Sequence, residues 1–248
     1  MPTPIVVSMS LKGFRDRLLQ ARHGRDALKR LRALEAQLPA PQTRLAIPFL
    51  FRGHGLYRNI RPMQSQFEIG ELYQTVLRRR PKVAVEIGTC HGGTLYLWCQ
   101  AAAPRATIIS IDLPEGEFGG GYPACRAEFY QAFANPGQEI HLVRADSHSP
   151  KTAAQVQQLL GGREIDFLFI DGDHTYAGVK QDFELYRPLV AKNGLIALHD
   201  IAPRADEPRI EVWKFWQELK QRQPGVIEWL DDSANGRRIG IGLISAVA

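Results

Sequence analysis

Two acids and a histidine follow directly on an unbroken apolar run in the stretch 167–176, FLFIDGDHTY. The apolar residues are aromatic or branched, as in a central strand that is buried on both faces. Because unpaired charges are costly inside a core, the strand must end where Asp171, Asp173 and His174 begin. Ligands of open α/β sheets bind outside the carboxyl ends of the strands. The stretch therefore predicts a reaction centre; the alternative is that Asp173 and His174 only cap the next helix.

A glycine-containing turn follows an earlier apolar strand in the stretch 85–94, VEIGTCHGGT. Gly88 permits a tight turn, while Gly92 and Gly93 allow a ligand and the next helix to approach the backbone closely. The N–H groups at the start of that helix can then point at a bound group. A strict GxGxxG pattern is absent, which weakens the interpretation as a pyrophosphate-binding dinucleotide site.

Further polar residues end the next two expected strands. Asp112 lies where a carboxylate can accept hydrogen bonds from both ribose hydroxyls of a cofactor. Sites for NAD and for S-adenosylmethionine both use this feature, so Asp112 does not distinguish them. Asp146 and Ser147 could bind an adenine edge; the alternative is that Asp146 caps the helix that begins at Pro150.

An alternation of strands and helices must position these turns. We expect strands at 83–87, 107–111, 139–144, 165–170 and 195–198, with helices at 92–103, 125–134, 150–160 and 176–191. A helix at 209–222 follows, and strands at 226–230 and 238–243, with Asn235 and Gly236 in the turn between them, close the chain. This order predicts an α/β, Rossmann-like three-layer sandwich. Its mostly parallel seven-stranded sheet would end in an antiparallel hairpin.

The N-terminal part of the chain is basic. Residues 1–80 hold 15 Lys and Arg against 5 Asp and Glu, whereas the remainder holds 16 against 21. A helix is expected at 11–38, broken near Gly24, with a leucine stripe at Leu28, Leu31, Leu34 and Leu38. It could pack on the domain, which is the simplest choice, join two copies as a homo-oligomer, or lie on a membrane. We divide the chain into a basic helical extension and linker (1–62) and a catalytic domain (63–248), which opens with a helix at 65–79.

Composition indicates the cellular location and the partner classes to expect for the protein. The three cysteines, Cys90, Cys99 and Cys125, form no CxxC motif, so we expect reduced thiols and a cytoplasmic protein. The N-terminus lacks the pattern of a signal peptide. No apolar run approaches the ~20 residues of a membrane helix, so no transmembrane segment is expected. No nucleic-acid partner is expected either, since a basic face is more often a solvated helix surface.

Together these residues resemble a class I S-adenosylmethionine-dependent methyltransferase. The stretch 169–201, FIDGDHTYAGVKQDFELYRPLVAKNGLIALHDI, resembles the branch that includes cephalosporin-hydroxylase-like proteins and macrolide-sugar O-methyltransferases. The resemblance implies that S-adenosylmethionine binds at Glu86, Gly88, Thr89, Gly92, Gly93, Thr94, Asp112, Asp146, Ser147 and Asp171.

In metal-dependent members of that branch, an Asp after the fourth strand and an acidic pair after the fifth bind Mg²⁺, and a His three residues after the first Asp is the general base. The resemblance thus implies a metal at Asp171, His199 and Asp200, with His174 as the catalytic base. Here His199 stands where those members have an acid. Imidazole is a poorer ligand for a hard cation, so this departure favours a softer divalent ion or no metal.

The leading hypothesis is O-methylation of a hydroxyl on a small molecule of the sugar or natural-product type, either with or without the assistance of a divalent metal. One alternative is an NAD(P)-dependent oxidoreductase, which lacks the strict glycine pattern. Another is a non-catalytic cofactor-binding module whose basic N-terminal arm binds anionic partners. The sequence has no recognisable code for the acceptor.

Overall fold

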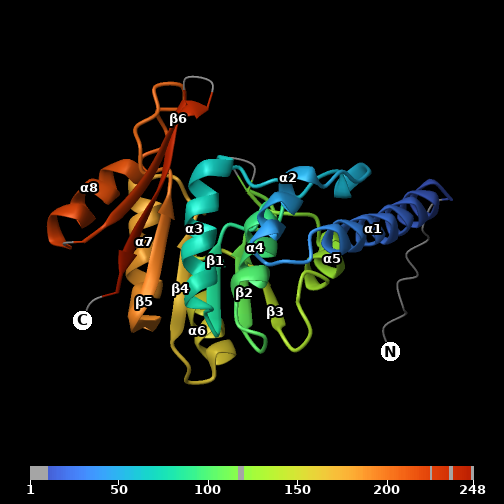
Figure 1. Ribbon diagram of the computed structural model, residues 1–248, viewed down its shortest axis with the longest axis horizontal. Helices are drawn as coiled ribbons and strands as arrows, with labels where there is room; N and C mark the ends of the chain where they lie inside the picture. Colours follow the sequence, from blue (N-terminus) through green and yellow to red (C-terminus); the bar gives the residue numbers. More distant parts are fainter. Residues whose placement is uncertain (1–10, 117–119, 224, 235–236, 247–248) are drawn as a thin grey trace, which may run out of the picture.

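A sheet of seven strands forms the middle layer of the computed structural model, which describes residues 11–116, 120–223, 225–234 and 237–246 (Figure 1). The strands are β1 Val83–Ile87, β2 Thr107–Asp112, β3 Glu139–Arg144, β4 Ile165–Ile170, β5 Val190–His199, β6 Ile227–Ala234 and β7 Arg237–Ser245. Their order is β3-β2-β1-β4-β5-β7-β6, and β7 runs antiparallel to both neighbours, whereas β1 to β5 are parallel. The predicted α/β fold with its closing hairpin is confirmed.

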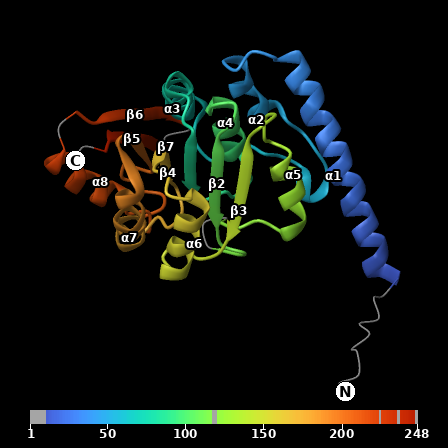
Figure 2. The same cartoon turned by 90° about the horizontal axis from the view of Figure 1, so that it is seen from below.

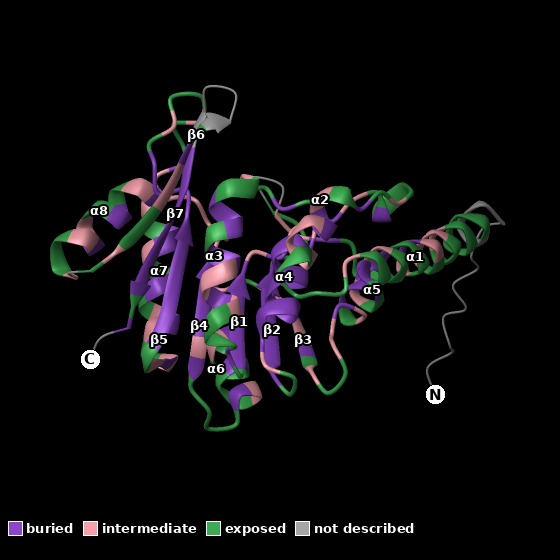
Figure 3. Ribbon diagram, viewed as in Figure 1, coloured by how far each residue is buried: buried purple, intermediate pink, exposed green. Residues whose placement is uncertain are grey.

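Two layers of helices cover the sheet because its central strands are apolar on both faces. In β4, Phe167 and Phe169 join one buried cluster, whereas Leu168 and Ile170 join the other. One layer holds α3 Gln66–Arg79, α4 Gly93–Ala101 and α5 Ala127–Gln131; the other holds α6 Pro150–Leu160, α7 Tyr176–Tyr186 and α8 Val212–Arg222 (Figure 2). Figure 3 shows the central strands buried and the outer helix surfaces exposed.

The N-terminal residues share the core of the first helical layer. Helix α1 (Leu11–Gln37) is followed by η1 (Thr43–Ala46), α2 (Ile47–Leu50) and η2 (Gly55–Tyr57). Ala27 and Leu31 of α1 are buried in the same cluster as α4 and α5. The prediction that α1 packs on the domain is thus confirmed for its C-terminal half, while its N-terminal half extends away from the sheet (Figure 1).

The expected break of α1 at Gly24 was wrong. The helix runs through this glycine, and an added Cβ there would lie 3.3 Å from the ring of Tyr57. A larger side chain would crowd that ring, so the small residue serves the packing of α1 against η2 rather than an interruption.

The predicted helix at 176–191 was too long. The α-helix ends at Tyr186, a 3₁₀ turn, η5, covers Arg187–Leu189, and β5 already starts at Val190. Pro188 explains the difference, because proline has no N–H to continue a helix. The predicted turn at Asn235 and Gly236 lies outside the described residues. Within the described ranges, none of the helices combines the length and apolar character that a membrane crossing requires.

Candidate active site

A cavity of about 1210 Å³ lies along the edge of the sheet where the parallel strands end. The register aligns these ends, because Ile87 of β1 pairs with both Ile111 of β2 and Ile170 of β4. The turns that follow the strands therefore open into one space. The predicted site residues that line it are Gly88, Asp112, Asp146, Ser147, Asp171, His174, His199 and Asp200.

The carboxylate of Asp112 organises the turn after β1. Its Oδ2 accepts hydrogen bonds from the backbone N–H groups of Thr89 (3.0 Å) and Cys90 (2.7 Å), and its Oδ1 accepts one from Gly121 (2.9 Å). Burial raises the pKa of Asp112, and these hydrogen bonds act in the opposite direction. Asp112 thus joins two walls of the cavity at the position expected for a ribose contact.

Two glycines in this turn occupy positions that a side chain cannot. Gly88 has a φ of +98°, and an added Cβ would lie 2.0 Å from the carbonyl oxygen of Asp171. Gly92 has a φ of +79°, and an added Cβ would lie 2.5 Å from the ring of Tyr130. The turn after β1 therefore packs directly against the end of β4, which brings the glycine-containing turn and the acidic stretch together.

Glu86 lies beneath this turn and does not line the cavity. It is fully buried, and its Oε1 accepts a hydrogen bond from Ser110 Oγ (2.6 Å), which is 2.5 Å from Thr89 Oγ1. Burial raises the pKa of Glu86 to about 8, so the group holds a proton at neutral pH. Glu86 thus supports the turn from below. Of the other predicted cofactor residues, Thr89, Gly93 and Thr94 line a small adjoining pocket, and Gly92 precedes α4.

The turn after β3 forms another wall of the cavity. Oδ1 of Asp146 accepts a hydrogen bond from the backbone N–H of His148 (2.9 Å). The N-cap position of α6 belongs to Ser149, so Asp146 is not the helix cap that was the alternative interpretation. The Asp146 side chain is 59% exposed beside Ser147, as an adenine contact requires.

Helix α7 holds this turn in place from the outer layer. Nε2 of His148 lies 3.1 Å from the carbonyl oxygen of Gly178 and 3.4 Å from Oδ1 of Asp182. The hydroxyl of Tyr186 donates a hydrogen bond to the carbonyl oxygen of Ser147 (2.9 Å). The carboxylate of Asp182 raises the pKa of His148 to about 9, although burial acts in the opposite direction.

Two acids and two histidines meet between the ends of β4 and β5. Nδ1 of His174 is 2.8 Å from Oδ2 of Asp200. Nδ1 of His199 is 3.0 Å from Oδ1 of Asp171 and 3.5 Å from Oδ2 of Asp200. Asp200 has a φ of +59°, a backbone conformation that is costly for a residue with a side chain and that clusters at functional sites. Each carboxylate is therefore paired with an imidazole.

The charges of this group act on one another strongly. Burial lowers the pKa of His174, but the hydrogen bond to Asp200 and the charges of Asp171 and Asp200 outweigh it and raise the pKa. Burial also lowers the pKa of His199, but the charges of Asp200, Asp171 and Glu68 outweigh burial and raise this pKa well above its ordinary value. Burial raises the pKa of Asp200, but the two histidines lower it to about 2. The surrounding acids thus favour the charged form of both imidazoles, and the imidazoles favour the charged form of Asp200.

The sequence did not indicate two further residues that reach this group. Nε2 of Gln64 donates a hydrogen bond to Oδ2 of Asp171 (2.6 Å), and Oε1 of Glu68 lies 3.4 Å from Nε2 of His199. Glu68 also forms a capping box with Ser65 at the start of α3. The Ser65-x-x-Glu68 pattern was the available signal, but it indicates only a helix start.

The start of α7 separates the two interpretations of His174. The N-cap is Thr175, whose side chain accepts a hydrogen bond from the N–H of Gly178 (3.0 Å). Asp173 contributes to this helix start, because its Oδ1 accepts a hydrogen bond from the N–H of Thr175 (2.8 Å). His174 is not the cap and lines the cavity instead.

The possible metal ligands in this group are Asp171, His174 and Asp200, each with one ligand atom within 4.8 Å of the others. This set includes His174, whereas the sequence suggested His199. Mg²⁺ prefers an octahedral shell of oxygens, and here an imidazole is among the donors while each carboxylate already contacts an imidazole nitrogen. The residues therefore do not fit Mg²⁺.

Comparisons with known sequences match the part of the chain that contains most of these site residues. Residues 85–201 match the family model described as a methyltransferase domain. The chain is 29% identical over 150 residues to the uncharacterized protein y4gI of Sinorhizobium fredii, and 29% identical over 157 residues to the uncharacterized protein R132 of Acanthamoeba polyphaga mimivirus. These alignments cover 59% and 60% of this chain but 16% and 65% of the relatives. The chain thus spans less than two thirds of either relative.

Solved structures share the fold at low identity. The O-methyltransferase from Bacillus cereus in complex with SAH has a TM-score of 0.53 at 15% identity, and the match covers 97% of this chain and 93% of that one. The O-methyltransferase TomG from Streptomyces achromogenes, involved in tomaymycin synthesis and solved with SAM, has a TM-score of 0.52 at 16% identity. That match covers 72% of this chain and 78% of TomG.

Proposed function

We propose that the chain is a class I, S-adenosylmethionine-dependent methyltransferase that methylates a hydroxyl oxygen of a small molecule, and we proceed from the match of residues 85–201 to a methyltransferase domain. The observation that carries this proposal is the meeting of Asp171, His174, His199 and Asp200 beside the turn of Gly88 in one cavity. The choice of oxygen follows the function given for the B. cereus and S. achromogenes proteins of this fold.

The turn after β1 and the acid after β2 would hold the cofactor. Gly88 leaves room at the turn, Asp112 would accept hydrogen bonds from the ribose hydroxyls, and Asp146 with Ser147 would contact the adenine. S-adenosylmethionine, when bound, supplies a methyl group on a positively charged sulfur. The acids that line this cavity outnumber its bases and give it a negative field that favours such a cation.

His174 would remove the proton of the acceptor hydroxyl. Asp200 orients the imidazole through Nδ1, so Nε2 becomes the atom that accepts the proton as the carbon–oxygen bond forms. Asp200 would also stabilise the imidazolium that results. His199 and Gln64 would hold Asp171 in position from either side. Because the residues do not fit Mg²⁺, we assign no step to that ion.

Calorimetry and isotope transfer test this proposal together. We expect the purified protein to bind S-adenosylhomocysteine, and Asp112→Asn to weaken binding by about tenfold or more, since a charged hydrogen bond contributes ~1.5–3 kcal/mol. Labelled methyl from S-adenosylmethionine should appear as an acid-stable ether on members of a sugar and polyol panel. Equal affinity of wild type and Asp112→Asn would exclude the ribose contact, and label found only on amines would exclude the oxygen acceptor.

A further inference from the structure

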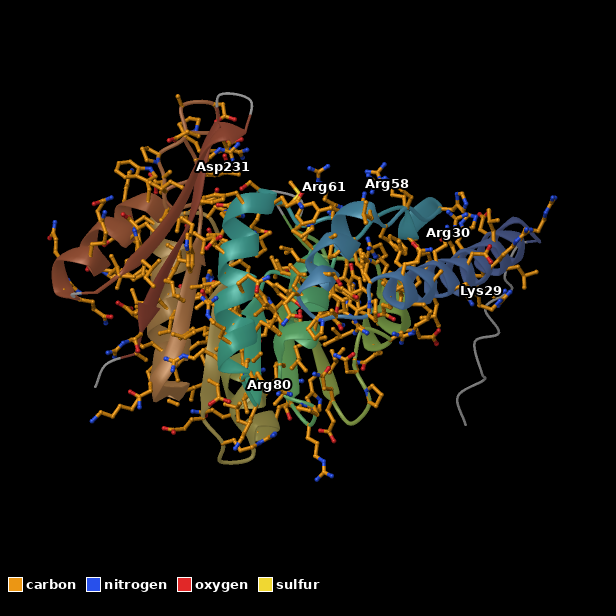
Figure 4. All side chains as sticks on the ribbon, in the orientation of Figure 1. Lys29, Arg30, Arg58, Arg61, Arg80 and Asp231 are labelled. Atoms are coloured by element: carbon orange, nitrogen blue, oxygen red, sulfur yellow. The ribbon has the colours of Figure 1, made fainter. Side chains whose placement is uncertain are left out.

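A short segment between η2 and α3 places two arginines on the rim of the cavity. Arg58 and Arg61 are both exposed, and Arg61 lines the cavity. In Figure 4 they point outward along the same edge of the molecule, across from Asp231 on the far side of the rim. Three residues of extended chain span at most about 11 Å, so a single extended ligand can reach both.

Neither arginine is neutralised within the described part of the chain. No ion pair there includes Arg58 or Arg61, and the Arg61 guanidinium lies 5.6 Å from the centre of the Phe49 ring. The arginine on the opposite side of the cavity differs, because Arg204 contacts Asp206 (3.0 Å) and Asp200 (3.9 Å). The positive charge at the rim is therefore available to a ligand.

A third guanidinium adds to this charge from below. Arg126 is buried and donates hydrogen bonds to the carbonyl oxygens of Asn59 (2.9 Å) and His91 (3.0 Å). Burial lowers the pKa of His91, and the charges of Arg126 and Arg58 lower it further. Three arginines thus create a positive potential around one short segment.

The interior of the cavity has the opposite charge. Seven acids line the cavity against four bases other than Arg61, namely His148, His174, His199 and Arg204, so an anionic group is repelled from the inside and attracted to the rim. The volume of about 1210 Å³ exceeds the ~300–1,000 Å³ of ordinary small-molecule pockets. The cavity therefore has room for the cofactor and for an acceptor that reaches from the rim to His174.

We propose that the methyl acceptor carries an anionic group, such as a phosphate, which binds Arg58 and Arg61 while its neutral hydroxyl end reaches His174. This inference rests on the proposed methyltransferase function and specifies its substrate class. Arginine suits the role, because its planar guanidinium matches the oxygens of phosphate and carboxylate. The cofactor's own carboxylate is the other possible anion, and the experiment must separate the two.

Phosphate titration of the protein saturated with S-adenosylhomocysteine tests the proposal. We expect inorganic phosphate to shift the amide signals of residues 58–61, and Arg58→Ala/Arg61→Ala to weaken phosphate binding at least tenfold without changing affinity for S-adenosylhomocysteine. Arg80→Ala is the matched control, since Arg80 is an exposed arginine at the opposite end of the molecule (Figure 4). It should bind phosphate as the wild type does.

Several results would overturn the proposal. The proposal fails if the wild type and the double variant bind phosphate equally well. It also fails if the wild type does not bind phosphate. Loss of S-adenosylhomocysteine affinity in the double variant would assign the arginines to the cofactor. Arginine-dependent binding to phosphatidylglycerol vesicles, without phosphate binding, would assign them to a lipid surface. Failure of methyl transfer with phosphate binding intact would instead contradict the proposed function, so the two failures are distinguishable.

Discussion

His199 contacts three carboxylates, and the charge of its imidazole determines how strongly these carboxylates repel one another. The imidazole is buried against Asp171, Asp200 and Glu68. A positively charged imidazole there offsets carboxylates that would otherwise repel one another. This explains how two neighbouring strand ends can both carry acids in a mostly buried position.

The role of His174 leads to a prediction about turnover and pH. His174→Gln should keep S-adenosylhomocysteine affinity and lose ~10²–10⁴-fold in kcat, the usual contribution of a positioned base. Because Asp200 raises the pKa of His174, the base is protonated and turnover is lost as pH falls through a value above ~6.5. Asp200→Asn should move this acidic limb to lower pH. Full kcat in His174→Gln, measured by labelled-methyl transfer, would leave the imidazole with a structural role.

Chelation tests the metal interpretation separately. Since the donor set does not fit Mg²⁺ and both carboxylates contact imidazoles, we expect turnover to stay within about twofold after treatment with EDTA and dialysis. Loss of activity that Mn²⁺ restores, in wild type but not in Asp171→Ala, would show instead that Asp171, His174 and Asp200 form a metal centre.

Gly88 gives a prediction about local geometry. Gly88→Ala would place a methyl 2.0 Å from the carbonyl oxygen of Asp171 at a φ of +98°, so the turn or the end of β4 must move. We expect an unfolding free energy lower by several kcal/mol and loss of S-adenosylhomocysteine binding. Gly161→Ala is the matched control, because its φ is +58° but nothing lies within 4 Å of the added methyl. Its cost should be only ~1 kcal/mol, as for an αL glycine. Similar urea midpoints for the two variants would contradict the argument.

At the scale of elements, α7 connects the two halves of the site. Its first turn follows His174, and its next two turns hold the loop of Asp146 and Ser147 through His148 and Asp182. A shift of α7 would therefore displace the reaction centre and the proposed adenine contact together.

The His148–Asp182 pair gives α7 a pH-dependent contribution to stability. The folded pKa of His148, about 9, exceeds its unfolded value of ~6.5, so this stabilisation is fully present below ~6.5 and is lost as pH rises through about 9. Asp182→Asn should therefore destabilise the protein more at pH 6.5 than at pH 10. Urea denaturation of both proteins at the two pH values measures this difference. A constant difference would mean that the pair does not carry the charge interaction.

Element types could be predicted from the sequence more reliably than the contacts between them. The strand 165–170 was predicted with its observed bounds because an apolar run and a burst of charge define both ends. The start of β5 was missed because Lys192, Asn193 and Gly194 resemble a loop, although Ile165 pairs with Val190. Glu68 was missed as a site residue because its contact with His199 joins residues far apart in the chain.

At the scale of the whole molecule, α1 behaves as two parts. Leu18 and Leu19 are 55% and 48% exposed, whereas Ala27 and Leu31 are buried. Deletion of residues 1–20 should leave the melting temperature nearly unchanged. Deletion of residues 1–40 should cost at least ~3 kcal/mol, since one buried leucine contributes ~1.5–3 kcal/mol.

Calorimetric melting of the two truncated proteins compares these costs, and equal losses would contradict the division of α1. Light scattering of the shorter deletion also tests the expectation that this helix joins two copies. A lower mass than that of the wild type would support that expectation, and an unchanged mass would leave α1 with intramolecular packing alone.

The cavity walls come from turns that follow the core strands and from rim segments outside the parallel strands. This division suggests how proteins of this fold could acquire new substrates. The proposed cofactor contacts follow core strands β1 to β4, whereas the rim belongs to the stretches 61–66 and 204–210 and to the hairpin of β6 and β7. Rim segments can therefore be exchanged by recombination without disturbing the parallel strands, provided that Gln64 and Arg204, which contact Asp171 and Asp200, are kept. Variants selected for new acceptors should accumulate substitutions in those two stretches, and chimeras that swap them should inherit the donor's substrate choice while the cofactor turn stays constant.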